Sequence, residues 1–110
     1  MNNTKSDRYF LSKILLELNF IIEHTKEKTI EEIENNIILL KSIMFSLIQI
    51  SEHSDKLSTE LKNQYKDVSW RAMKGMRNRI VHDYGNVDIK IIFYTCKVSV
   101  PEFFKQIRNI

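Results

Sequence analysis

The chain has 110 residues, a formal net charge of +3 and a hydrophobic content of 43%. That length is typical of a single domain, predicted over residues 1–110, and the apolar content excludes a disordered chain. Two glycines and one proline offer little material for tight turns, which favours long helices over many short strands. The sequence therefore predicts an all-α, up-and-down bundle of four long helices plus one short helix, with a kinked or split last helix.

The first two predicted helices carry apolar stripes at three- and four-residue steps. The first runs from about residue 5 to 27, with Ser6 as its predicted N-cap. The second follows Thr29, which forms a capping-box pattern with Glu32, and runs to about Ser54. Apolar residues lie on more than one side of this second helix, which predicts two neighbouring helices or a partner chain.

The later helices follow a short connection. Residues 57–65 predict a short helix, and a longer one runs from Trp70 to about His82, with Ser69 as its predicted N-cap. Gly85 fits the stop of that helix, because glycine adopts left-handed backbone angles readily.

The last predicted helix starts near Asp88 and contains Pro101, which should kink or split it. Cys96 is the only cysteine, so no intrachain disulfide can form, and it is predicted to be a small core residue. The polar N-terminus lacks a signal-peptide pattern, and no apolar run approaches the roughly 20 residues that span a bilayer. We expect a cytoplasmic protein with no membrane partner.

The segment Arg-Asn-Arg-Ile-Val-His-Asp-Tyr at residues 77–84 gathers the groups with the most chemistry. On a helix, Arg77 falls on the face that also carries Trp70 and Met73, which should be buried. A buried guanidinium is costly unless it is paired, so it needs an acidic partner or a cleft. Glu52 on the second helix is the partner that we expect.

Asn78 and His82 are four residues apart and share a second helical face with Gly75. Gly75 allows either close approach of a backbone or ligand beside His82 or tight helix packing within one chain. Arg77 and His82 are about 140° apart on an ideal helix. They can reach one phosphate only where the helix ends or distorts, or where two copies of the motif meet across a dimer.

The run from Trp70 to Tyr84, followed by Val87-Asp88, resembles the HEPN superfamily. Its Arg77-x4-His82-x-Tyr84 spacing is similar to that of the HepT-like toxins of toxin–antitoxin pairs. Residues 48–52 resemble the second-helix signature of the family, which usually has Gly before the Glu and Ala after it. Ser51 and His53 stand there in this chain and put the local packing in doubt.

This resemblance implies a metal-independent endoribonuclease that acts as a homodimer, the toxin of a type II-like toxin–antitoxin system. Arg77 and His82 would be the catalytic pair, and Asn78 is the polar residue after the Arg. Tyr84 would receive AMP from a small nucleotidyltransferase antitoxin, which silences the toxin. The resemblance implies no cofactor and no metal site.

The residue chemistry agrees with RNA as substrate, because RNA carries its own nucleophile in the 2′-hydroxyl. An imidazole can accept that proton or protonate the leaving oxygen near neutral pH. A guanidinium can bind the phosphate bidentately, and Asn78 can orient His82 or hold a phosphate oxygen. Arg71, Lys74 and Arg79 form either an RNA-facing basic rim or ordinary solvated charges.

Two other functions compete with the nuclease. One is a non-catalytic HEPN dimer that serves as the binding subunit of a nucleotidyltransferase. The other is a structural helical adaptor, for which alanine at His82 would change nothing except stability. The joint presence of Arg77, Asn78, His82 and Tyr84 favours the enzyme.

Overall fold

The computed structural model describes residues 6–82 and 88–110, with the side chains of residues 80–82 outside that description. Within these ranges the backbone is helical, and no strand occurs. The elements are α1 (Asp7–Thr25), α2 (Ile30–Glu34), α3 (Ile37–Asp55), α4 (Thr59–Gln64), α5 (Trp70–His82), α6 (Ile89–Tyr94), the π-helical turn η1 (Thr95–Ser99) and α7 (Val100–Ile107). The predicted all-α bundle is confirmed.

Side-chain caps define where several helices begin. Ser6 accepts a hydrogen bond from the Tyr9 N–H at the start of α1. Thr29 and Glu32 form the complete capping box at α2: the Thr29 hydroxyl accepts from the Glu32 N–H, and the Glu32 carboxylate accepts from the Thr29 N–H. These caps satisfy backbone donors that have no partner inside the helix. Gly85, the predicted stop of α5, lies outside the described residues.

The prediction of one continuous helix from Thr29 to Ser54 was wrong. α2 ends at Glu34, and α3 begins at Ile37 after a new N-cap, because the Asn36 side chain accepts a hydrogen bond from the Leu39 N–H at 3.0 Å. Asparagine competes for backbone groups and favours caps over helix interiors, which explains the break. The apolar periodicity on either side of the break conceals it.

The last helix is bent, as Pro101 predicts. Asp88 caps α6, and the chain then passes through η1 directly into α7. In η1 the Val100 N–H donates to the Thr95 carbonyl, five residues back. Pro101 has no N–H to give to the carbonyl four residues before it, and its ring crowds that carbonyl. The wider turn therefore lies immediately before the proline.

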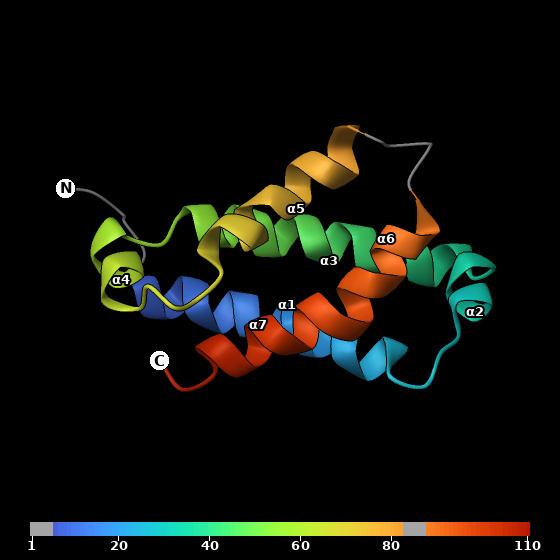
Figure 1. Cartoon of the computed structure of the whole chain (residues 1–110), viewed down its shortest axis with the longest axis horizontal. Helices are drawn as coiled ribbons and strands as arrows, with labels where there is room; N and C mark the ends of the chain where they lie inside the picture. The colour runs from blue at the N-terminus through green and yellow to red at the C-terminus, as the bar shows by residue number, and fades with distance from the viewer. Residues whose placement is uncertain (1–5, 83–87) are drawn as a thin grey trace.

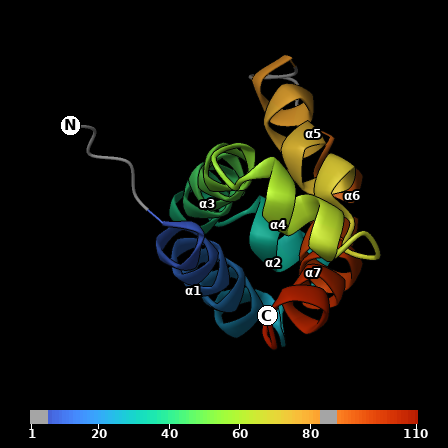
Figure 2. The same ribbon diagram turned by 90° about the vertical axis from the view of Figure 1, so that its left-hand side faces the viewer.

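The long helices surround a single cluster of buried apolar side chains. α1 lies beside both α3 and α7, and α5 crosses α3 (Figure 1). Viewed end-on, α1, α3, α5 and α7 enclose the centre of the bundle (Figure 2). The C-terminal part of α5 leans away from the other helices in both views. The fully buried aliphatic residues include Ile14, Leu18, Ile21, Ile43, Leu47, Ile50 and Ile107.

No described helix is both long enough and apolar enough to cross a membrane.

Candidate functional site

α5 carries the motif residues and is anchored through its first half. Met73 and Met76 are buried against the core. Trp70 is half-buried, and its indole N–H donates to the Tyr65 carbonyl at 2.9 Å, which identifies it as a packing residue. From Arg77 to Arg79 the side chains are exposed. The helix therefore presents the start of the motif at the surface of the bundle.

Arg77 and Glu52 form the ion pair expected from the sequence. Arg77 Nε lies 3.2 Å from Glu52 Oε2, and the two side chains are 48% and 44% exposed. Arg77 thus lies at the edge of the buried face of α5, whereas the helical projection placed it in the middle. The pair joins α5 to α3 and leaves the guanidinium accessible to solvent.

Two further contacts join α3 and α5 where these helices cross, and neither could be predicted from the sequence. The Ser51 hydroxyl, which is buried, donates to the Lys74 carbonyl at 2.7 Å. Lys74 Nζ pairs with Asp55 Oδ1 at 3.3 Å. Ser51 is one of the two residues that differ from the usual second-helix signature, and its hydroxyl links α3 to α5 through this hydrogen bond. A contact to a backbone carbonyl leaves no side-chain pattern that could have revealed it.

The other departure, His53, is half-buried beside Phe10, with ring centroids 6.0 Å apart. Burial, more than the nearby Lys13 and Lys56, lowers the pKa of His53, against the opposing pull of Glu17. Among the described residues its buried Nδ1 has no hydrogen-bond partner.

The remaining predicted polar residues of α5 are exposed. Asn78 follows Arg77 directly and faces solvent, as do Arg71, Lys74 and Arg79. Lys74 is engaged by Asp55, so its charge is partly offset. The exposed positive charges lie before and after Arg77 along α5, and a role for them in an RNA-facing rim stays a prediction.

His82 is the last residue of α5, and its side chain is not among those described; Tyr84 lies outside the described residues altogether. Whether Arg77 and His82 reach one phosphate therefore stays a prediction. Gly75 is informative, because a Cβ built on it would meet no atom of the described residues within 4 Å. Tight packing against the described part of the chain therefore does not explain this glycine.

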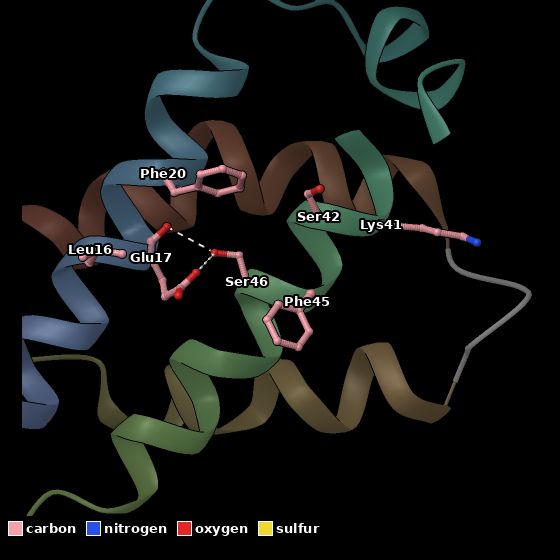
Figure 3. A pocket seen from close by; sticks show the side chains of 7 residues that line it. All are labelled: Leu16, Glu17, Phe20, Lys41, Ser42, Phe45 and Ser46. Atoms are coloured by element: carbon pink, nitrogen blue, oxygen red, sulfur yellow. Dashed lines mark hydrogen bonds between the residues drawn. The ribbon is translucent and has the colours of Figure 1, made fainter. Parts of the chain in front are cut away.

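A shallow hollow of about 500 Å³ lies between α1 and α3 (Figure 3). Ser46 donates to the carboxylate of Glu17 at 2.6 Å on its floor. Its other lining residues are Leu16, Phe20, Lys41, Ser42 and Phe45. Phe45 and Leu16 are each 62% exposed, which is unusual for large apolar side chains in this chain. The hollow lies two turns of α3 before Glu52.

In the part of the chain that the structure describes, no three His, Cys, Asp or Glu side chains gather as a metal-binding group.

Comparison with known proteins gives one family and several relatives. The "Putative RNase TTE0752" of Caldanaerobacter subterraneus is 32% identical over 106 residues, which cover 96% of this chain and 95% of that protein. The "Putative RNase MJ0125" of Methanocaldococcus jannaschii is 30% identical over 92% of this chain and 87% of its own length. The "Probable ribonuclease HepT" of Thermococcus cleftensis is 26% identical over 96% and 98%. No solved structure matches significantly.

The family described as Ribonuclease HepT-like matches residues 14–110, which contain the whole of α3, α5 and the motif. That match covers most of the chain and agrees with the relatives named as RNases. The chain belongs to the HepT-like ribonuclease family.

Proposed function

We propose that this chain is a metal-independent endoribonuclease that acts in the cytoplasm. The 2′-oxygen of RNA loses its proton to His82 and attacks the adjacent phosphorus. The bond from phosphorus to the 5′-oxygen breaks, that oxygen takes up a proton, and the products are a 2′,3′-cyclic phosphate and a 5′-hydroxyl. Arg77 binds the phosphate oxygens and offsets the charge that accumulates in the transition state. Asn78 positions one of those oxygens.

The half-exposed guanidinium of Arg77 carries this proposal. It lies at the surface of α5 with Asn78 beside it and basic residues on either side, in a chain that belongs to a ribonuclease family. The Arg77 guanidinium must be accessible to solvent if it is to bind an RNA phosphate.

Cleavage of a short RNA by the purified chain tests the proposal. We expect His82→Ala to lower kcat by about 10²–10⁴-fold and Arg77→Ala by about 10²–10³-fold. A substrate with a single 2′-deoxy nucleotide at the scissile position should resist cutting, because it lacks the nucleophile. Addition of a chelator should leave the rate unchanged.

Activity that collapses in chelator and returns with magnesium would contradict metal independence. Cutting of the 2′-deoxy substrate at the same position would exclude attack by the 2′-oxygen. RNA or nucleotide binding without cleavage, unchanged in His82→Ala, would favour the binding-subunit alternative.

We further propose that the chain is the toxin of a toxin–antitoxin pair, silenced by a nucleotidyltransferase antitoxin that adds AMP to Tyr84. Support for this comes from the motif spacing, which places Tyr84 seven residues, or about two helical turns, after Arg77. A nucleotide attached there brings a phosphate toward the Arg77 guanidinium and competes with RNA for it. Induced expression should stop growth for the wild type and not for His82→Ala.

Finally, we propose that the chain works as a homodimer. One stripe of α3 lies opposite its most buried face and reaches the Arg77–Glu52 pair, with residues at three- and four-residue steps: Ile38, Lys41, Phe45, Ile48 and Glu52. Ile48 in this stripe is partly buried against the core. Ile38 and Phe45 are 77% and 62% exposed. Contiguous exposed apolar side chains mark interaction surfaces. We call this set the α3 stripe; a second copy on it would adjoin the site.

A further inference from the structure

The carboxylate of Glu52 meets Arg77 at Nε, the guanidinium nitrogen nearest the backbone. A guanidinium can bind an anion along two kinds of edge: a side edge, with Nε and one Nη, or an end edge, with both Nη groups. A carboxylate at Nε occupies the side edge. The end edge is then the one that a phosphate can take bidentately.

The helices that carry this pair are already held together by other contacts. The Ser51 hydroxyl donates to the Lys74 carbonyl at 2.7 Å, and Asp55 pairs with Lys74 at 3.3 Å. Met73 and Met76 are buried on the same stretch of α5. An ion pair that is about half exposed adds little to stability. Its main physical effect is therefore on the direction of the Arg77 side chain.

We propose that Glu52 is a positioning residue for RNA cleavage, which holds the side edge of Arg77 so that its end edge meets the scissile phosphate. This role rests on the proposed ribonuclease activity. A long side chain loses conformational freedom when it binds, and one that is already held loses less. The carboxylate is also an anion close to the phosphate, so it repels RNA in the ground state. Its benefit must therefore appear in kcat and not as a lower KM.

Steady-state cleavage of an RNA oligonucleotide by three variants of the full chain separates these effects. Glu52→Ala should lower kcat about tenfold, with KM unchanged or lower. Glu52→Gln should recover most of kcat, because its amide oxygen can take the place of the carboxylate oxygen beside Nε. Asp55→Asn is the matched control: it removes the other ion pair between α3 and α5 and should keep kcat and KM within about twofold.

A second readout needs no RNA. In ¹⁵N-labelled protein the Arg77 Nε–H resonance, assigned with Arg77→Lys, should exchange slowly with water in the wild type. It should exchange rapidly in Glu52→Ala and remain protected in Asp55→Asn. Combining Glu52→Ala with Arg77→Lys should add no loss of kcat beyond that of Arg77→Lys alone, because Glu52 acts through the guanidinium.

Three results would overturn this role. A higher kcat/KM in Glu52→Ala with unchanged kcat would make Glu52 a competitor for the guanidinium. Equal effects of Glu52→Ala and Asp55→Asn, in kinetics and in exchange, would reduce it to a structural contact. A wild type that cuts no RNA would remove the proposed function and this role with it, whereas cleavage that depends on His82 and not on Glu52 would remove the role alone.

Discussion

Individual residues differ in how far their sequence context reveals their role. A charged residue among apolar helix positions needs a partner, so the Arg77–Glu52 pair was predictable, although Arg77 is more exposed than the helical projection indicates. The buried Cys96 was also predictable from its apolar neighbours, and burial raises the pKa of its thiol to about 12. The role of Ser51 was not predictable, because its hydrogen-bond partner is a backbone carbonyl 23 residues away in the sequence. Site residues that contact the backbone need the fold before they can be recognised.

At this scale the decisive residue is Tyr84, whose proposed role is regulatory. Tyr84→Phe removes the oxygen that would accept AMP and leaves the ring. We expect cleavage of RNA within about threefold of the wild type, since the proposed chemistry assigns no step to Tyr84. Incubation with ATP and the cognate nucleotidyltransferase should add the mass of AMP to the wild type and silence it, and should do neither to Tyr84→Phe.

The control for this experiment is Tyr94, an exposed tyrosine elsewhere in the chain. Tyr94→Phe, on α6, should be modified and silenced like the wild type, because Tyr94 lies outside the motif. Loss of RNA cleavage in Tyr84→Phe without any nucleotidyltransferase would instead make Tyr84 catalytic. Silencing of Tyr84→Phe by the antitoxin without a change of mass would show that complex formation suffices.

At the scale of helices, apolar periodicity and capping residues locate most elements to within a few residues. α1, α4 and α5 lie close to their predicted ranges, and the bend before Pro101 was expected. The break at Asn36 was missed because the apolar pattern continues across it, and only a local competition between an asparagine side chain and the helix decides it. The angle between helices is also hidden in the sequence. Ser51, Glu52 and Asp55 of α3 contact α5 at Lys74 and Arg77, and the end of α5 diverges from the other helices (Figure 1).

Gly75 offers a test at this scale. Nothing in the described chain lies within 4 Å of a Cβ at this position, so Gly75→Ala should raise stability by about 0.5–1 kcal/mol through better helix propensity. If an RNA strand or a second copy approaches α5 there, the same change should lower kcat/KM, by about tenfold, and Gly75→Leu should lower it further. Thermal unfolding and cleavage measured on the same samples separate the two effects.

More stable variants with unchanged cleavage would show that neither RNA nor a second copy comes close to α5 at Gly75. A lower stability of Gly75→Ala would contradict the finding that, among the described residues, the space around this position is open.

At the scale of the whole molecule, the apolar residues on more than one side of the second helix predicted a surplus of apolar surface, to be covered by two neighbouring helices or by a partner chain. The structure locates that surplus on the α3 stripe and on the adjoining hollow between α1 and α3 (Figure 3). Lys41 and Glu17 give this face one positive and one negative charge, so two copies related by a two-fold axis can pair them across the contact. Neither the location nor this charge arrangement was predictable, because both depend on how α1 packs on α3.

Phe45→Glu tests whether this face joins two copies. Phe45 is already 62% exposed, so the substitution should leave the stability of one chain nearly unchanged. A carboxylate placed in an apolar contact should raise the dimer dissociation constant by on the order of 100-fold. Sedimentation at several concentrations should show twice the 13.1 kDa chain mass for the wild type and a shift to one chain mass for the variant.

Tyr94→Glu is the matched control, because Tyr94 is 61% exposed but lies on α6, away from the α3 stripe. Dissociation by Tyr94→Glu alone would move the interface to α6, and a wild type of one chain mass at every concentration would exclude the homodimer.

The cleavage rate of the Phe45→Glu monomer then decides whether one copy or two copies supply the residues of the site. α5 runs unbroken from Arg77 to His82, and these residues are about 140° apart on an ideal helix, so a monomer that still cuts RNA requires this helix to distort when RNA binds. A monomer that has lost activity while keeping the Arg77–Glu52 pair requires the two groups to come from different copies.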